Sequence, residues 1–281
     1  MASQRISIDD LTQGLGAFDD LEFIDAGTFG DTFRVVRGDD ELALKVIMIE
    51  DLPDYLWERE LEALGRVDHP NIVNLEGAGT FEVDGREYPY AFFEFIVGGS
   101  LKEAIAHGQT VDDPAMARGL LTGLLSGVGE IHDLGILHRD IKPANICLRD
   151  GHFDQPVLLD FGLARVLDMS THTKLPARIG TTGYMSPEQL QGRAARRRSD
   201  LFSVGVVTYE AISGQHPFLD SSISGVQSLH DRIESGPIAD LGDLAPNCPD
   251  EVRAVVMRLL RYWGHDRLGI SAALADLREG H

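Results

Sequence analysis

The stretch Ile136-Leu137-His138-Arg139-Asp140-Ile141-Lys142-Pro143-Ala144-Asn145 places a His, an Arg, an Asp, a Lys and an Asn close together. Apolar residues continue on both sides of it, and Ile146 and Leu148 are typical of a short buried segment. We therefore expect the polar cluster to lie on a loop that the core holds in place. Such a cluster is costly in a core, where polar groups need partners, and is well suited to chemistry.

A second polar turn follows 15 residues after Asn145. The apolar run Val157-Leu158-Leu159 predicts a strand, and Asp160-Phe161-Gly162 ends it. Asp140, Asn145 and Asp160 together offer one candidate general base and two oxygen ligands for a hard cation. Mg²⁺ prefers such ligands beside a phosphate.

The pattern His-Arg-Asp-x-Lys-Pro-x-Asn followed by Asp-Phe-Gly resembles the catalytic core of a eukaryotic-like (Hanks-type) protein serine/threonine kinase of the bacterial kind. The resemblance covers about residues 18–275. It implies an α+β, bilobal protein-kinase-like fold with a small β-rich N-lobe and a larger helical C-lobe. The expected divisions are an N-terminal extension at 1–17, the N-lobe at 18–96 and the C-lobe at 97–281.

The resemblance also implies a role for each polar residue of the two turns. Asp140 matches the residue that accepts the proton of the substrate hydroxyl, and Lys142 would lie on the γ-phosphate. Asn145 and Asp160 would hold Mg²⁺. Positioning and electrostatic stabilisation supply most of the catalysis in phosphoryl transfer.

Lys45, at the end of a predicted strand, matches the lysine that contacts the α- and β-phosphates of ATP. A buried lysine needs a paired carboxylate, and the following predicted helix offers Glu58, Glu60 and Glu62. The family places this glutamate nine residues before a His-Pro-Asn turn, which begins here at His69 and so selects Glu60.

The turn around Gly27 and Gly30 resembles the glycine-rich loop that covers the phosphates, with Phe29 at its tip as a shield against water. It departs from the family pattern in two places. Asp25 replaces the first glycine, and Thr32 replaces the valine that packs on adenine. An added carboxylate near a triphosphate repels it, so we expect weakened nucleotide affinity.

The remaining nucleotide contacts are also implied by the resemblance. Ala43 would close the adenine slot from above, and Ile146 and Leu148 would close it from below. The backbone between Glu94 and Ile96 would provide hydrogen bonds to adenine.

Residues 180–188 resemble the end of an activation segment, in which Thr181 matches the threonine that touches the catalytic Asp and Lys in serine/threonine kinases. Arg139 is expected to bind a phosphate on this segment, added at Thr173 or Thr171. Two structural pairings are also expected. Glu188 should pair with Arg267, and Asp200 should hold the backbone of the catalytic loop.

Alternating apolar residues and turn residues predict three antiparallel strands between 18 and 47 and two more near 73–83 and 88–95, the latter two joined by Asp84-Gly85. Helices are expected near 53–66, 101–107, 114–134, 186–192, 198–213 and 249–260. Residues 1–17 have weak helical character and are either packed on the N-lobe or frayed, and 218–248 show no clear pattern.

The composition of the chain limits the classes of partner that it can bind. The net charge of −20 argues against nucleic acid and against an anionic membrane. Residues 1–95 hold 7 basic and 22 acidic residues, so the acidic N-lobe either is a solvated surface or docks a basic protein partner. Two cysteines, Cys147 and Cys248, and no apolar run of 18 residues indicate a cytoplasmic protein, or the cytosolic domain of a longer membrane-anchored one.

The expected function is an ATP- and Mg²⁺-dependent protein serine/threonine kinase that phosphorylates protein substrates and its own activation segment. One alternative is a pseudokinase-type binding or scaffold module, in which Asp25 weakens nucleotide binding. A second is a small-molecule kinase on a related fold, whose members usually lack the Lys142-Pro143 pattern and the 181–188 platform.

Overall fold

The computed structural model describes residues 5–26, 30–49, 53–160 and 182–279, without the side chains of Asp54, Leu56 and Glu60. The chain divides into two compact units. The first comprises Met1–Asp68 and Val73–Phe95, and the second comprises His69–Ile72 and Ile96–His281.

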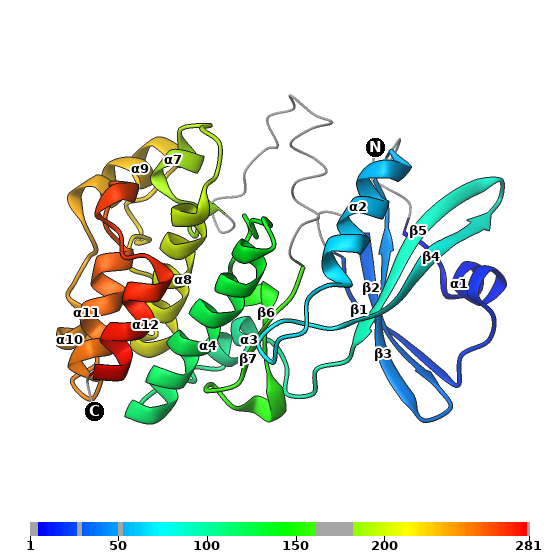
Figure 1. Cartoon of the computed structure of the whole chain (residues 1–281), viewed down its shortest axis with the longest axis horizontal. Coiled ribbons are helices and arrows are strands. Elements are labelled where there is room, and N and C mark those ends of the chain that lie inside the picture. Colours follow the sequence, from blue (N-terminus) through cyan, green and yellow to red (C-terminus); the bar gives the residue numbers. More distant parts are fainter. Residues whose placement is uncertain (1–4, 27–29, 50–52, 161–181, 280–281) are drawn as a thin grey trace. The chain divides into compact units, whose positions relative to one another are not determined.

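The first unit is built on a five-stranded antiparallel sheet of order β1-β2-β3-β5-β4 (Figure 1). Its strands are β1 (Asp20–Ala26), β2 (Gly30–Arg37), β3 (Asp40–Ile47), β4 (Leu75–Val83) and β5 (Arg86–Glu94). The predicted three-strand meander and the second hairpin are both confirmed. Asp84 and Gly85 have φ of 53° and 76°, the left-handed values that a tight hairpin turn requires.

Alternating side chains of this sheet form the core of the first unit. Phe33 and Val35 of β2 and Leu44 and Val46 of β3 are buried there, together with Leu11. Leu11 comes from α1 (Ile8–Leu15), which begins at a Ser7–Asp10 capping box and contacts β4. The helix of the N-terminal extension is therefore packed on the sheet. Helix α2 (Asp54–Leu64) also belongs to this unit and buries Trp57.

The second unit is mainly helical (Figure 1). Its elements are α3 (Leu101–Ala106), α4 (Pro114–Asp133), η1 (Pro143–Asn145), β6 (Ile146–Leu148), η2 (Arg149–Gly151), β7 (Pro156–Leu158), α7 (Pro187–Leu190), α8 (Arg197–Ser213), α9 (Val226–Ser235), α10 (Leu241–Leu244), α11 (Asp250–Leu259), η3 (Gly264–Asp266) and α12 (Ile270–Glu279). The helices predicted from apolar periodicity are confirmed to within a few residues. Helices α9 and α10 lie in the segment where the sequence shows no clear pattern.

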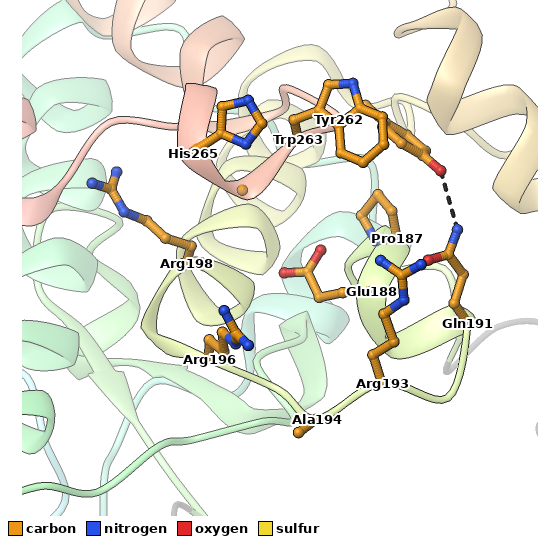
Figure 2. A pocket seen from close by; sticks show the side chains of 11 residues that line it. Pro187, Glu188, Gln191, Arg193, Ala194, Arg196, Arg198, Tyr262, Trp263 and His265 are labelled. Carbon is orange, nitrogen blue, oxygen red and sulfur yellow. Dashed lines mark hydrogen bonds between the residues drawn. The ribbon is translucent and has the colours of Figure 1, made fainter.

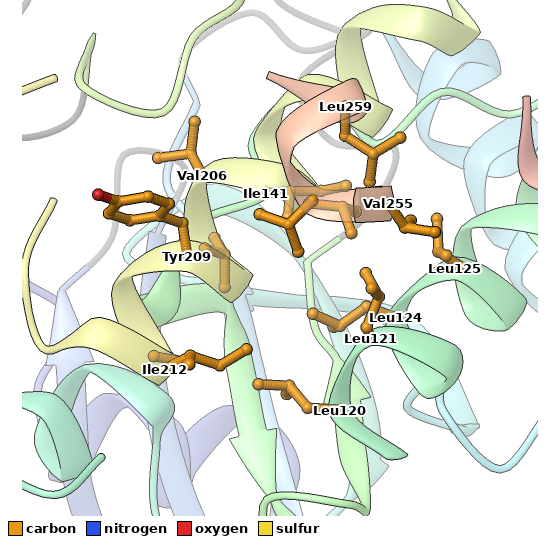
Figure 3. Packing of buried hydrophobic residues seen from close by; sticks show 14 of the residues in the cluster. Leu120, Leu121, Leu124, Leu125, Ile141, Val206, Tyr209, Ile212, Val255 and Leu259 are labelled. Atoms are coloured by element: carbon orange, nitrogen blue, oxygen red, sulfur yellow. The ribbon is translucent and has the colours of Figure 1, made fainter. Parts of the chain in front are cut away.

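Helix α8 is the centre of the second unit. Its residues from Ser199 to Tyr209 are all buried, so the helix is surrounded by protein on every side. Side chains of α4 and α11, including Leu120 and Val255, pack with Tyr209 and Ile212 in the same core (Figure 3). The helix ends at Gly214, whose left-handed φ of 69° suits glycine.

Candidate active site

The side chain of Asp200 holds the backbone of the loop before η1, as predicted. Asp200 is 1% exposed and accepts hydrogen bonds from the backbone N–H groups of His138 (3.0 Å) and Arg139 (2.8 Å). Its Oδ2 also accepts one from Nε2 of His132 at 2.7 Å. These bonds hold Arg139 at a φ of 68°, a left-handed conformation that is costly for a residue with a side chain.

Two polar side chains, those of Lys142 and Asn145, converge on the carboxylate of Asp140. Lys142 Nζ lies 2.6 Å from Asp140 Oδ2. Asn145 Nδ2 donates to the same Oδ2 at 3.0 Å and to the Asp140 carbonyl oxygen at 2.8 Å. The amide nitrogen of Asn145 is thus directed at Asp140, which leaves Oδ1 as the amide atom suited to a cation. The side chains of Asp140 and Lys142 are 24% and 18% exposed, so the cluster is reachable from solvent.

The short antiparallel pair β6 and β7 brings the second polar turn to the first. Ile146 pairs with Leu158 in this ladder, and the next residue, Leu159, donates from its backbone N–H to the Asn145 carbonyl oxygen at 2.9 Å. Asp160 follows directly, with a left-handed φ of 56°. The second unit therefore gathers Asp140, Lys142, Asn145 and Asp160 at the ends of adjacent segments.

Burial and nearby carboxylates together affect the thiol of Cys147. Burial raises the pKa of the Cys147 thiol to about 11, and the negative charges of Glu103 and Asp160 add to the rise. Cys147 therefore stays protonated near neutral pH. It lies in β6 as an apolar-type side chain and is not a nucleophile.

The first unit holds Lys45 and Ala43, two further residues assigned to the nucleotide. Lys45 is 4% exposed in β3, where its backbone register is opposite Thr32 of β2 and Ala91 of β5. Ala43 lies opposite Arg34 and Phe93 in the same two ladders. These placements put Lys45 and Ala43 on alternate positions of one strand, so both side chains project from the same face of the sheet.

Packing within the sheet explains why a glycine occupies position 30. A β-carbon there would lie 1.8 Å from the carbonyl oxygen of Val46 in the paired strand β3. No side chain fits at such a distance, so β2 and β3 require Gly30 whether or not a phosphate is bound.

Several assigned residues lie outside the part of the chain that the structure describes. These are Gly27 and Phe29 of the glycine-rich loop, Thr171, Thr173 and Thr181 of the activation segment, and the side chain of Glu60 in α2. Glu94 ends β5, and its backbone N–H donates to the Asn74 carbonyl oxygen at 3.0 Å. Ile96 is 7% exposed and is the first residue of the second unit's long segment.

The segment after the activation loop is fixed by the predicted Glu188–Arg267 pair, which is confirmed. Arg267 donates from Nη1 to Glu188 Oε1 at 2.8 Å and from Nη2 to Oε2 at 3.0 Å, and its side chain is 0% exposed. Ser199 Oγ adds a hydrogen bond to Oε1 at 2.7 Å. Burial alone would raise the pKa of Glu188, but the hydrogen bonds from Arg267 and Ser199 lower it to about 2.

Two positioning contacts were not predicted from the sequence. One is the His132–Asp200 hydrogen bond, which joins residues 68 positions apart. The other comes from Gln189 in α7, whose Nε2 donates to the Arg139 carbonyl oxygen at 3.2 Å. Gln189 therefore ties the Ser-Pro-Glu segment to the catalytic loop. Only the closeness of Gln189 to the Pro187-Glu188 motif could have drawn attention to it.

No described helix is both long and apolar enough to span a membrane.

Comparison with known proteins places this arrangement in a family. The family model for the protein kinase domain matches residues 18–277. The chain is 34% identical over 242 residues to a probable serine/threonine-protein kinase PknB of Corynebacterium glutamicum, covering 84% of this chain and 37% of that protein. It is 32% identical over 259 residues to the DNA damage-responsive serine/threonine-protein kinase RqkA of Deinococcus radiodurans, with 88% and 37% covered.

A plant relative aligns over more of the chain. The serine/threonine-protein kinase AtPK1/AtPK6 of Arabidopsis thaliana is 30% identical over 276 residues, covering 95% of this chain and 55% of that protein. The chain thus spans roughly two fifths to one half of the length of these relatives. The β-rich unit, the helical unit and the family match together confirm the bilobal fold, and the chain belongs to the protein kinase family, in its eukaryotic-like (Hanks) type.

Proposed function

We propose that this chain is an ATP- and Mg²⁺-dependent protein serine/threonine kinase. The observation that carries the proposal is the cluster in which Lys142 and Asn145 both contact the Asp140 carboxylate on a loop anchored by Asp200. ATP and Mg²⁺ are the cofactors of the family, and the relatives above are named serine/threonine kinases.

Asp140 is the group that orients the substrate hydroxyl and receives its proton. The hydroxyl oxygen forms a bond to the γ-phosphorus, the bond from that phosphorus to the β-γ bridging oxygen breaks, and ADP leaves. Lys142, 2.6 Å from Asp140 Oδ2, orients the carboxylate and balances phosphate charge as the phosphoryl group moves. The phosphoryl group is carried to a Ser or Thr hydroxyl of a protein.

Asn145 and Asp160 fit a hard cation by their donor chemistry, because an amide oxygen and a carboxylate are both oxygen ligands. Bound Mg²⁺ supplies positive charge that neutralises the phosphate oxygens. Asn145 is 8% exposed and is held by two hydrogen bonds to Asp140, so its side chain is fixed before any ligand arrives. Such preorganisation removes an ordering cost from the reaction.

The nucleotide site proposed for the N-lobe (residues 18–96) consists of Gly27, Phe29 and Gly30 over the phosphates, Lys45 paired with Glu60, Ala43 at the adenine, and backbone groups of Glu94 and Ile96. The C-lobe (residues 97–281) supplies the catalytic loop, and residues 1–17 form the extension. The burial of Lys45 supports its part, since the ammonium group of a lysine that is 4% exposed needs an anionic partner.

Regulation is proposed through the activation segment. Arg139 precedes Asp140 and would bind a phosphate added to Thr173 or Thr171, while Thr181 would meet Asp140 and Lys142 at the substrate platform. Such a phosphate adds about two negative charges and several acceptor oxygens, enough to order a loop against an arginine.

The proposed partners are protein substrates, with a basic protein as a further partner of the acidic N-lobe. The 22 acidic and 7 basic residues of positions 1–95 support an electropositive partner and disfavour nucleic acid. We propose a cytoplasmic location for this chain, either alone or as the cytosolic part of a longer membrane-anchored protein.

Incubation with Mg²⁺ and ATP followed by mass spectrometry tests the proposal. We expect phosphate on Ser or Thr of a generic basic protein and on the activation segment of the chain itself. The matched control is Asp140→Asn, which keeps the shape of the side chain and removes its basicity. No incorporation by either protein would refute kinase activity and favour a scaffold role. Equal incorporation by both would refute the role assigned to Asp140.

A further inference from the structure

A pocket with a volume of about 490 Å³ lies in the second unit (Figure 2). All of its lining residues come after the catalytic loop in the sequence. It is formed by α7 and the turn after it, by the start of α8 and by the turn that contains η3. The lining residues that matter here are Arg193, Arg196, Glu188, Trp263 and His265.

The pocket is basic in an otherwise acidic chain. Residues 191–198 contain four arginines and no acidic residue, whereas the whole chain has a net charge of −20. Arg193 and Arg196 are both exposed, and no carboxylate among the described residues forms an ion pair with either guanidinium. By contrast, Arg197 lies 3.6 Å from Asp133, and Arg198 donates to the Arg267 carbonyl oxygen.

Glu188 does not oppose this charge, although its carboxylate faces the pocket (Figure 2). Both of its oxygens are occupied by Arg267, and Ser199 donates to one of them. The buried Arg267 guanidinium neutralises that carboxylate. The local excess of charge is therefore positive, and its exposed part comes from Arg193 and Arg196.

Aromatic side chains line the pocket opposite the arginines (Figure 2). Trp263 is 54% exposed, which is unusual for so large an apolar side chain. Its ring packs edge-on against Tyr262 with centroids 4.8 Å apart, and the Tyr262 hydroxyl is held by His230 at 2.9 Å and Gln191 at 3.2 Å. An exposed indole beside exposed guanidinium groups can contact an apolar side chain while the arginines bind an anion.

We propose that this pocket binds a phosphorylated Ser or Thr segment of a protein. Arg193 and Arg196 contact the phosphate, since a planar guanidinium matches phosphate geometry with two hydrogen bonds, and Trp263 packs against a residue next to the phosphorylated one. The biological source of the ligand rests on the proposed function: a serine/threonine kinase produces such segments, so the pocket holds a product or a substrate that is already phosphorylated.

A tryptophan of the chain serves as the fluorescent reporter for the test. It has two tryptophans, and Trp57 is 5% exposed in the first unit whereas Trp263 lines the pocket. Without ATP, the whole chain is titrated with a degenerate peptide library that has a fixed central phosphoserine, and with matched libraries that have serine or glutamate there. We expect a saturable change in tryptophan emission with the phosphoserine library alone, and we expect Trp263→Phe to abolish it.

Affinity is then compared among variants with fluorescently labelled libraries. Arg193→Gln and Arg196→Gln are each expected to weaken phosphopeptide binding about tenfold or more, because each removes charge-assisted hydrogen bonds. Arg258→Gln is the control: it removes the same charge from an exposed arginine of α11 that pairs with Asp276. Unfolding midpoints of all variants show that the fold is retained.

Two results would overturn the inference: the serine or glutamate library binding as tightly as the phosphoserine library, or the two pocket variants matching Arg258→Gln. Neither result bears on kinase activity, because the titration contains no ATP. Conversely, a chain that binds the phosphopeptide but transfers no phosphate would refute the proposed function and leave the pocket assignment intact.

Discussion

Replacing Glu188 by Gln should destabilise the fold measurably, because it leaves a buried arginine without its counter-charge. Arg267 is 0% exposed and pairs with both oxygens of Glu188. The lowering of the Glu188 pKa from 4.5 to about 2 corresponds to about 3 kcal/mol at 1.36 kcal/mol per unit. The carboxylate is 20% exposed, so screening reduces the expected loss in the free energy of unfolding to about 2 kcal/mol.

The other hydrogen-bond partners of Arg267 limit the expected loss in the free energy of unfolding. Its guanidinium also donates to the backbone carbonyl oxygens of Arg198, Arg261 and Tyr262, at 2.7 to 2.8 Å. These hydrogen bonds remain in the Glu188→Gln protein. We therefore expect less than the 3–5 kcal/mol typical of a buried pair that loses one member.

The pH dependence of this difference follows from the direction of the pKa shift. Because the folded-state pKa lies below the unfolded one, the ionised carboxylate stabilises the fold fully above pH 4.5, and this contribution is lost as pH falls toward 2. Denaturant unfolding of both proteins at several pH values measures it. The difference should be constant from pH 7 to 5 and should narrow below 4.5.

Asp276→Asn is the matched control for Glu188→Gln, because it removes a carboxylate from an exposed ion pair. The side chain of Asp276 is 44% exposed and that of its partner Arg258 is 53% exposed. The control should lower the free energy of unfolding by less than about 0.5 kcal/mol. The reasoning fails if Glu188→Gln is as stable as this control at pH 7. It also fails if the difference from the wild-type chain does not change with pH.

Two further substitutions test the site. Asp200→Asn replaces the carboxylate that accepts hydrogen bonds from His132 and from two backbone N–H groups. The free energy of unfolding should fall by about 2 kcal/mol or more in calorimetry, and kcat should fall with it in phosphate-transfer assays. Wild-type stability and activity in this variant would contradict the anchoring role. Gly30→Ala should cost about 1–3 kcal/mol, because its β-carbon meets the Val46 carbonyl oxygen. Gly77→Ala, in β4 with nothing within 4 Å, should not destabilise the fold in the same denaturation experiment. Equal stability of the two glycine variants would show that the close approach is not a constraint.

Much of the site could be predicted because its chemistry is carried by short contiguous motifs. Asp140, Lys142 and Asn145 lie within six residues on one loop, so their meeting at one carboxylate needs only local chain geometry. Asp160 comes next to them through a two-stranded ladder whose apolar strands are visible in the sequence.

The contacts that could not be predicted join distant segments. His132 of α4 contacts Asp200, which holds the catalytic loop, and Gln189 of α7 contacts the loop itself. No local feature marks His132, and only the neighbouring Pro187-Glu188 motif points to Gln189. The requirement for Gly30 arises from an adjacent strand, so its pattern suggests a phosphate loop before it suggests a packing constraint.

Helices α9 and α10 were missed for a related reason. They are short, and they lie among Gly, Pro, Asp and Ser residues that obscure apolar periodicity. Each is fixed by tertiary packing: Leu229 and Ile233 of α9 and Leu241 of α10 are buried against the core around α8. Tertiary contacts, which no short window of sequence contains, decide such elements.

The central claim is that Asp140 accepts the proton in phosphoryl transfer to a Ser or Thr hydroxyl, and single-turnover transfer of labelled phosphate by the wild-type chain and by Asp140→Asn tests it most directly. The account predicts transfer to Ser or Thr by the wild-type chain and a rate lower by about 10²–10⁴-fold in the variant, with unchanged unfolding midpoints. Equal rates in the two proteins, or a wild-type chain that transfers nothing, would contradict it.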